Sequence, residues 1–376
     1  MLVRCLKCCM PTTRPDTAFI GGVCSACVNH ANRPSIDWKA REGELIRILE
    51  NSKNGTGYHC IVPSSAGKDS FYQALRIREL GFRPLLVTAS TCMLTEVGRR
   101  NLDTLARYAT TIEVTPNKEV RRKLNRLGLE LVGDISLPEH WAILSIPFRV
   151  AADLGIPTLI YGENPLACYG SPSPSAAEAR VMTKRWTQEF GGYLGCRPQD
   201  MVGEQGITEA DMADYVLPDD DKLSRVTAYW LGQYEEWSSH RNARVAKQHG
   251  MVCQLPGPAN WWEAENQDNA MTGLHDFFGY IKYGYGRLCA QISVDIRNGL
   301  IGREDSMRVV RERDGLFPWM YMGVYNRDVL SHIGMNWDDF KVAFKRFTNE
   351  DLFSRVDDDL RPVLKEFADA ECSPAA

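Results

Sequence analysis

The sequence predicts an α/β protein with a doubly wound parallel sheet, an N-terminal four-cysteine zinc knuckle and a mostly helical C-terminal region. Strand-like and helix-like segments alternate between residues 58 and 161, which indicates βαβ units with helices on both faces of one sheet. Two Cys-x-x-Cys pairs precede this series, and residues 276–367 carry helix-like patterns. These three observations define the expected fold class.

The alternating series gives each expected element its place. Short β-branched and aliphatic runs predict strands, and the amphipathic stretches between them predict helices. Pro147 is expected to break the last helix, because proline removes a backbone hydrogen bond and clashes with the preceding turn. The expected strands are residues 58–62, 84–88, 111–115 and 158–161, and the expected helices are residues 70–80, 95–108, 119–127 and 139–154.

The chain is expected to divide into four parts. Residues 1–52 form the zinc knuckle and a linker helix, 53–170 the sheet-containing core, 171–275 an irregular insertion, and 276–376 a helical region on the substrate side. In parallel sheets of this kind, ligands bind beyond the carboxyl ends of the strands. The loops that leave those ends therefore carry the expected site.

The composition is that of an ordinary globular protein, with 44% hydrophobic and 24% charged residues among 376. Non-specific nucleic-acid binders are usually basic, so the net charge of −4 makes a nucleic-acid partner unexpected. The sequence shows neither an apolar run of membrane-spanning length nor a signal-peptide hydrophobic region near residue 1. We therefore expect a cytoplasmic protein with no membrane partner.

Four of the 12 cysteines form two ordered pairs, Cys5 with Cys8 and Cys24 with Cys27. Each pair can hold a metal ion from one tight turn, and the separation of the pairs suits a tetrahedral four-cysteine zinc site. The segment between them is too small to bury a core, so a metal ion would supply its folding energy. Redox cysteines and an iron–sulfur cluster are the alternatives. Two pairs without an open ligand position favour a structural zinc ion.

The loop between the first expected strand and the first expected helix has the features of a nucleotide site. Small residues at a helix start present backbone N–H groups to one point, with the positive end of the helix dipole behind them. Lys68 adds a cation, Ser65 and Ser70 add hydroxyl groups, and Asp69 fits beside phosphates if it shares a magnesium ion with them. An ordinary helix cap is the alternative.

The loop has the sequence Ser64-Ser65-Ala66-Gly67-Lys68-Asp69-Ser70. It is not a Walker A motif, which requires a glycine where Val62 stands and a serine or threonine where Asp69 stands. It resembles the PP-loop, Ser-Gly-Gly-x-Asp-Ser, of the ATP pyrophosphatase superfamily. Ala66 replaces the first glycine of that pattern, so we expect its backbone to avoid a positive φ.

Further short motifs accompany this loop along the chain: Ile36-Asp37-Trp38-x-x-Arg41, Gly98-x-x-Asn101-Leu102, Gly133-Asp134, Gly162-Glu163-Asn164, the run from Lys282 to Arg287, Ile296-Arg297 and Arg303-Glu304. Their joint order resembles the N-acetyl sugar amidotransferases, from the start of the chain to about residue 340. The resemblance implies an N-type ATP pyrophosphatase core at residues 53–170. It also implies conversion of an acetamido group on a nucleotide-linked sugar to an acetamidino group: ATP adenylates the amide oxygen, pyrophosphate leaves, and ammonia displaces AMP.

The resemblance assigns roles by matching position. The loop would hold the β- and γ-phosphates of ATP with Mg²⁺, Thr88 would lie near adenine or ribose, and Glu163 and Asn164 would lie across the crevice. For each predicted substrate arginine, a surface ion pair is the alternative. The predicted catalytic residues are Lys68, Asp69, Glu163, Asn164 and Cys168; the ATP-binding residues are Ser64, Ser65, Ala66, Gly67, Lys68, Asp69, Ser70, Thr88 and Gly162; and the substrate-binding residues are Arg287, Arg297 and Arg303.

Two cysteines keep a second chemistry open. Cys168 stands where the family usually has an acidic residue, and Cys92 lies in the loop after the second expected strand and is expected to face the crevice. A thiol there can carry a persulfide for ATP-dependent thiolation of a small molecule or nucleobase, although such cysteines often only pack. A third hypothesis, motivated by Ala66, is a zinc-bearing nucleotide-binding protein without catalysis.

The nitrogen donor is expected to come from outside this chain. Position 2 is not a cysteine, and Cys196 lacks the flanking pattern and partners of a glutaminase nucleophile. Ammonia would come from solution or from a separate glutaminase through a channel-forming subunit, as the resemblance implies; thiolation would need a sulfur donor instead. The expected acceptor is a small molecule, and the sequence leaves a homo-oligomer open.

Overall fold

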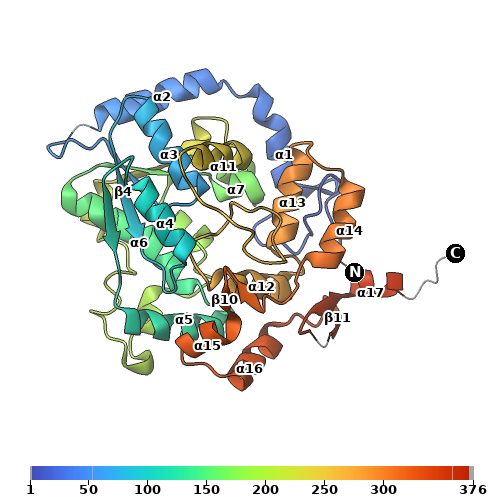
Figure 1. The fold of residues 1–376 in the computed structure, drawn as a ribbon. Coiled ribbons are helices and arrows are strands. Elements are labelled where there is room, and N and C mark those ends of the chain that lie inside the picture. Colours follow the sequence, from blue (N-terminus) through green and yellow to red (C-terminus); the bar gives the residue numbers. More distant parts are fainter. Residues whose placement is uncertain (1, 53, 358, 372–376) are drawn as a thin grey trace.

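The computed structural model describes residues 2–52, 54–357 and 359–371, and among these a six-stranded sheet forms the centre of the fold (Figure 1). The strand order is β5-β4-β3-β6-β8-β7, in which β7 is antiparallel to β8 and all other neighbours are parallel. The predicted parallel α/β architecture is confirmed. The strands are β3 Cys60–Pro63, β4 Pro84–Ala89, β5 Thr111–Val114, β6 Thr158–Tyr161, β7 Val181–Met182 and β8 Thr227–Trp230.

Apolar cores cover both faces of the sheet. Successive residues of a strand point to opposite faces, so each strand contributes side chains to both cores. Ile61 and Leu159 point into one apolar core with Trp141 of helix α6. Val62 and its neighbours in β4 and β6 point into a second core with Phe71 of helix α3. Two buried layers on one sheet explain why these strands are continuous aliphatic runs rather than alternating ones.

Helix starts around the sheet are fixed by local side-chain caps. The side chains of Asp37, Thr95 and Asn117 accept backbone N–H hydrogen bonds at the starts of α2, α4 and α5. The helices of this part are α1 Ser25–Asn32, η1 Arg33–Ser35, α2 Trp38–Asn51, α3 Lys68–Glu79, α4 Glu96–Leu105, α5 Lys118–Val132, α6 Leu137–Leu154, α7 Pro165–Tyr169, α8 Pro174–Ala177, α9 Lys184–Phe190, η2 Pro198–Met201, η3 Glu204–Gly206, α10 Asp220–Ser224, η4 Leu231–Gln233 and α11 Ser239–Gln248.

The expected break at Pro147 is wrong, because α6 continues through it to Leu154. Proline at this position removes the hydrogen bond that the carbonyl of Ile143 would accept. In the structure the hydroxyl of Tyr161, at the end of β6, donates to that carbonyl at 3.1 Å. A partner from the neighbouring strand therefore replaces the lost helical hydrogen bond.

The central sheet also extends beyond the part of the chain in which it was expected. Both β7 and β8 lie in residues 171–275, where the sequence predicts an irregular insertion. Strand β8 pairs along its whole length with β6, so Thr158 lies opposite Thr227 and Tyr161 opposite Trp230. The insertion thus supplies one edge of the sheet.

The C-terminal region is mostly helical, as predicted, with short hairpins between helices. Phe340 and Phe344 are buried in its apolar core together with Phe278. In the described residues none of the helices combines the length and the hydropathy that crossing a bilayer requires. The elements are α12 Thr272–Tyr283, α13 Arg287–Arg297, α14 Arg303–Arg313, β9 Met320–Tyr321, β10 Val324–Tyr325, α15 Asn326–His332, α16 Trp337–Phe347, β11 Phe353–Val356, β12 Pro362–Leu364 and α17 Lys365–Glu371.

The N-terminal segment contacts the C-terminal helices. Figure 1 shows the N-terminal segment (blue) beside α13 and α14 (orange), and Arg4 forms a 2.6 Å ion pair with Glu366 in α17. Cys9 is packed among Leu288, Cys289 and Ile292 of α13. The cysteine-containing segment, which includes the hairpin β1 Phe19–Ile20 and β2 Val23–Cys24, is therefore held against the C-terminal helices.

Candidate active site

A cavity of about 390 Å³ opens at the carboxyl ends of β3, β4 and β6. Strand β3 pairs with β4 on one side and with β6 on the other, so the chain changes its direction of winding there. Such a switch point is where parallel α/β sheets bind ligands. Ser64, Ser65 and Ser70 line the cavity from the loop after β3, and Glu163 lines it from the loop after β6.

The loop after β3 forms a tight turn around Ala66. The expectation that Ala66 avoids a positive φ is wrong, because its φ is 55°. Side-chain oxygens hold this turn: the Ala66 N–H donates to Ser64 Oγ at 3.2 Å, and the Ser65 N–H donates to Ser70 Oγ at 3.2 Å. At the N-cap position Gly67 no side chain of the described residues caps α3, so its first turn can present N–H groups to an anion.

Lys68 is buried at the start of α3 between two carboxylates. Its Nζ lies 2.8 Å from Asp69 Oδ2 and 2.9 Å from Glu265 Oε2. Burial by itself lowers the pKa of Lys68, but the adjacent Asp69 and Glu265 raise that pKa well above its ordinary value. Asn242 of α11 donates to Asp69 Oδ1 at 2.8 Å. The cation of the loop is thus fixed by residues from distant parts of the chain.

Glu163 brings a carboxyl group into the same cavity. Burial, followed by the negative charge of Asp69, raises the pKa of Glu163 to about 8. A raised pKa favours the protonated side chain, which can donate a hydrogen bond as well as accept one.

Among the other predicted site residues, Asn164 and Gly162 contribute to the fold, and Thr88 lies next to residues of the cavity lining. Asn164 is buried, caps α7 through the Leu166 N–H, and donates to the carbonyl of Ala177. Gly162 lies against the ring of Trp237, where a Cβ would come within 3.1 Å of it. Thr88 is buried with no hydrogen-bond partner for its hydroxyl in the described residues, and the residues on either side of it line the cavity.

Of the three predicted substrate arginines, one lines the cavity. Arg287 lies at its edge and is paired with Asp276 at 2.8 Å. Arg297 instead donates to the backbone carbonyl of Cys168 at 2.9 Å. Arg303 donates to the carbonyls of two of the paired cysteines and so supports the metal-binding segment. Arg297 and Arg303 are committed to backbone groups of the fold.

Neither of the two cysteines considered as sulfur carriers is among the described residues that line the cavity. Cys168 lines a small separate pocket beside Arg297 and His30, and Cys92 packs in the C-terminal core with its Sγ 3.4 Å from His332 Nε2. The cavity lining among the described residues includes neither, so the expectation that Cys92 faces the crevice is wrong. Burial raises the pKa of each thiol to about 12, so both are protonated at neutral pH.

Much of the cavity wall comes from residues that the sequence did not single out. Arg121 pairs with Glu139 at 3.1 Å, and both are buried. Asp268, in the segment before α12, also lines the cavity, and burial raises its pKa to about 6. For Asp134, His140 and His275 the sequence carries only a weak indication of a site. Asp134 belongs to a short Gly-Asp motif, and the two histidines lie in apolar helices.

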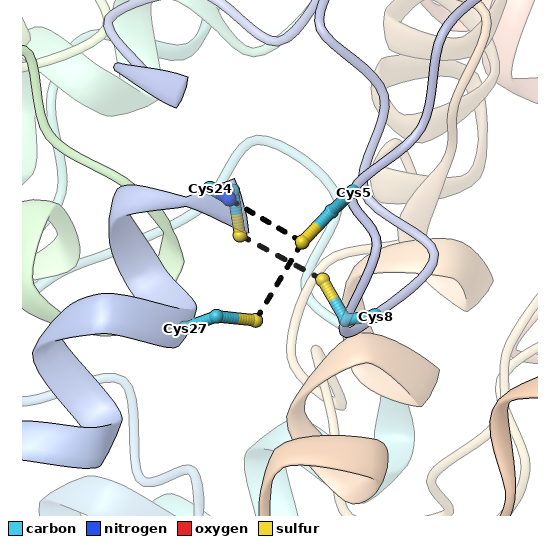
Figure 2. Close-up of side chains that lie close together, drawn as sticks. All are labelled: Cys5, Cys8, Cys24 and Cys27. Carbon is cyan, nitrogen blue, oxygen red and sulfur yellow. Dashed lines mark hydrogen bonds between the residues drawn. The ribbon is translucent and has the colours of Figure 1, made fainter. Parts of the chain in front are cut away.

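The four paired cysteines converge as predicted (Figure 2). The Sγ atoms of Cys5 and Cys27 are 3.9 Å apart, and those of Cys8 and Cys24 are 3.7 Å apart. Four sulfurs at the usual Zn–S distance of about 2.3 Å in a tetrahedron lie about 3.8 Å from one another. None of the described cysteines forms a disulfide. The cluster can therefore hold a metal ion such as zinc.

Comparison with known families adds one finding. Residues 224–366 match the family described as "LPS biosynthesis protein WbpG-like, C-terminal domain". The matched segment supplies Asn242 and Glu265 to the charged loop, and Asp268, His275 and Arg287 to the cavity wall. The match covers less than half of the chain. A comparison with curated proteins gave no match.

Proposed function

We propose that this protein is an ATP-dependent amidotransferase that converts an acetamido group of a small, nucleotide-linked sugar to an amidine. The carrying observation is that Ser64, Ser65 and Ser70 and the carboxyl of Glu163, whose pKa is raised, line one cavity at the switch point of the sheet. The similarity of residues 224–366 to LPS biosynthesis proteins supports a sugar as the acceptor.

In this proposal the loop binds the β- and γ-phosphates of ATP. The uncapped start of α3 would supply N–H donors, and Lys68 would supply a positive charge close to the departing pyrophosphate. Asp69 would hold Mg²⁺, which supplies further charge neutralisation on the phosphates. The 2.8 Å contact between Asn242 and Asp69 would orient that carboxylate for the ion.

The remainder of the cavity would hold the acceptor. The amide oxygen attacks the α-phosphorus of ATP, the bond to pyrophosphate breaks, and an O-adenylated imidate forms. Ammonia then adds to the imidate carbon, the C–O bond breaks, AMP leaves and one proton is released, giving the amidine. Glu163 lines the cavity and has a raised pKa, so its protonated form would hydrogen-bond to the acceptor without repelling the phosphates.

The proposal is tested by product analysis. The purified protein is incubated with Mg-ATP, ammonium and a panel of nucleotide-linked acetamido sugars, and AMP and pyrophosphate are measured. We expect AMP and pyrophosphate in equal amounts, dependent on both ammonium and one sugar. Formation of ADP, or no nucleotide turnover with any sugar, contradicts the proposal, and turnover that requires a sulfur donor indicates thiolation instead.

Two matched variants locate the activity. Asp69→Asn removes the proposed metal ligand of the loop and should reduce turnover by at least about 100-fold, because charge stabilisation of a phosphoryl group contributes several kcal/mol. Asp103→Asn changes an exposed carboxylate on α4 that pairs with Arg99, and should leave turnover unchanged. Equal turnover in the Asp69→Asn variant and the wild type would remove the loop from the mechanism.

A further inference from the structure

A second cluster of possible metal ligands includes two residues of the same cavity lining, His140 and His275. Asp134 follows α5, His140 is the fourth residue of α6, and His275 is the fourth residue of α12. Nδ1 of His275 lies 2.7 Å from Asp134 Oδ1, and Nδ1 of His140 lies 3.6 Å from Asp134 Oδ2. The three ligand atoms all lie within 4.8 Å of one another.

These separations fit three ligands of one ion. Nitrogen and oxygen ligands at about 2.0–2.1 Å from a tetrahedral ion lie about 3.4 Å apart, and the two observed contacts fall on either side of that value. An aspartate that serves only to orient an imidazole contacts a single histidine ring. Here a second ring also turns its Nδ1 toward the same carboxylate, and the ring centroids are 5.2 Å apart.

The surroundings hold the ligands in place. Asp134 is 4% exposed, and its Oδ1 also accepts the Ser136 N–H at 2.8 Å. Nδ1 of His140, its proposed ligand atom, also lies 3.3 Å from the carbonyl of Gly192, a contact that metal binding at this nitrogen would replace. A ligand carboxylate fixed by a backbone N–H is the support that metal sites usually have around them.

The charged side chains next to this cluster are bound to other partners and do not occupy Asp134. Glu139 lies next to His140 in sequence but is bound by Arg121 and Asn125. Lys282 of α12 donates to the carbonyl of Val132 at 3.2 Å instead of pairing with Asp134. The carboxylate of Asp134 is therefore shared with the two histidines and with no other charged side chain at ion-pair distance in the described residues.

The cluster differs from the four-cysteine site in having an open side. Both histidines line the 390 Å³ cavity, whereas all four cysteines are buried. Three protein ligands with one position open to a cavity are typical of zinc sites that bind water or substrate, and four closed ligands are typical of structural sites.

We propose that Asp134, His140 and His275 bind a divalent transition-metal ion of the zinc class, whose open coordination position faces the cavity and takes an oxygen ligand from water or from the acceptor. This site goes beyond the amidotransfer proposal, since ion binding requires neither ATP nor ammonia. Zinc-class ions prefer two imidazoles and one carboxylate to the all-oxygen ligands that suit Mg²⁺.

Metal content tests the proposal directly. Full-length protein is loaded with Zn²⁺, dialysed, and analysed by mass spectrometry of the metal without any nucleotide. We expect two zinc ions per wild-type chain and one in the His140→Ala/His275→Ala variant. One ion in the wild type, or two in that variant, overturns the proposal.

A matched control excludes a general effect of losing a histidine. His240 lies 2.6 Å from Asp295, so it forms a His–Asp pair that lacks a second imidazole. The His240→Ala variant should keep two ions, and loss of an ion from it would count against the assignment.

Cobalt distinguishes the two sites and does not depend on complete folding of one variant. Co²⁺ bound to thiolates gives strong sulfur-to-metal charge-transfer bands, whereas Co²⁺ bound to nitrogen and oxygen gives only weak visible bands. We expect the Asp134→Asn variant to lose only the weak component. A spectrum of thiolate-bound Co²⁺ alone in wild-type protein with excess cobalt overturns the proposal. Because no turnover is measured, failure here is distinct from failure of the amidotransfer proposal.

Discussion

Nζ of Lys68 lies 2.9 Å from Oε2 of Glu265, a residue 197 positions further along the chain. The contact joins the loop after β3 to the segment that matches the LPS biosynthesis family. The buried positive charge is thus neutralised by a part of the chain outside the βαβ units in which the loop lies. The sheet and the segment before α12 therefore form one site.

Removal of Lys68 should destabilise the protein. Lys68→Met leaves Asp69 and Glu265 without their buried partner, and unpairing a buried ion costs about 3–5 kcal/mol. Urea unfolding should show a loss of this size. The double variant Lys68→Met/Glu265→Gln should recover part of it, because one unpaired charge has been removed. A single variant as stable as the wild type would show that the cluster is solvated.

Because the backbone at Ala66 has a positive φ, alanine-to-glycine changes there and in a helix should differ in their effect on the free energy of unfolding. Ala66 has a φ of 55°, where a side chain costs about 1–2 kcal/mol and glycine costs little. Ala66→Gly should therefore leave the free energy of unfolding unchanged or raise it by up to about 1 kcal/mol. Ala74→Gly, equally buried but within helix α3, should lower it by about 1 kcal/mol or more. Similar losses at both positions would contradict the strained turn.

The strands were predictable because each is marked by a short run of neighbouring residues. Parts of the site were not predictable, because they depend on contacts between residues far apart in the sequence. Strand β6 appears as a bounded aliphatic run in the sequence, whereas β8 is defined by its pairing with β6. The helix through Pro147 depends on a hydroxyl donated by Tyr161. Likewise, nothing near Lys68 in sequence indicates Glu265.

The same distinction explains the errors at single residues. The turn at Ala66 is held by the Ser64 hydroxyl, so local hydrogen bonds offset the steric preference of alanine. The four-cysteine cluster was predictable because the ligand spacing itself encodes the site. The grouping of His140 with His275 requires that α6 and α12 meet beside the cavity, which spacing does not encode.

Stability should depend on pH through Glu163. Its pKa is raised from 4.5 to about 8 in the folded protein, so between these values the unfolded chain loses a proton that the folded chain keeps. The free energy of unfolding therefore falls as pH rises across this window. Glu163→Gln removes this term, so the variant should gain stability relative to wild type from pH 5 to pH 8.

Urea titrations of the two ligand-free proteins at several pH values measure this difference. Glu79→Gln, which changes an exposed carboxylate paired with Arg76, is the matched control and should show a constant offset. A constant offset for Glu163→Gln as well would place its pKa near the ordinary value.

Neither cysteine thiol is expected to take part in turnover. Burial raises the pKa of Cys92 and of Cys168 to about 12, so less than about one thiol in ten thousand is ionised at pH 7. Cys92→Ser and Cys168→Ser should each keep nucleotide turnover within about twofold of wild type in the assay for amidotransfer. A loss of 100-fold or more in either variant would favour the thiolation chemistry.

Metal removal should loosen the N-terminal segment while the sheet remains folded. The four-cysteine cluster packs against α13 and is supported by Arg303, whose Nε donates to the carbonyls of Cys5 and Cys8 at 3.2 and 3.1 Å. Binding energy of a structural zinc ion is folding energy for a segment this small. Cys5→Ser should therefore lose one ion and expose the N-terminal segment to limited proteolysis, and Arg303→Ala should show a weaker form of the same change.

Cys196→Ser, which alters a cysteine outside the cluster, should resist the protease like the wild type. Full resistance of Cys5→Ser would show that packing against α13, and not the ion, holds this segment in place.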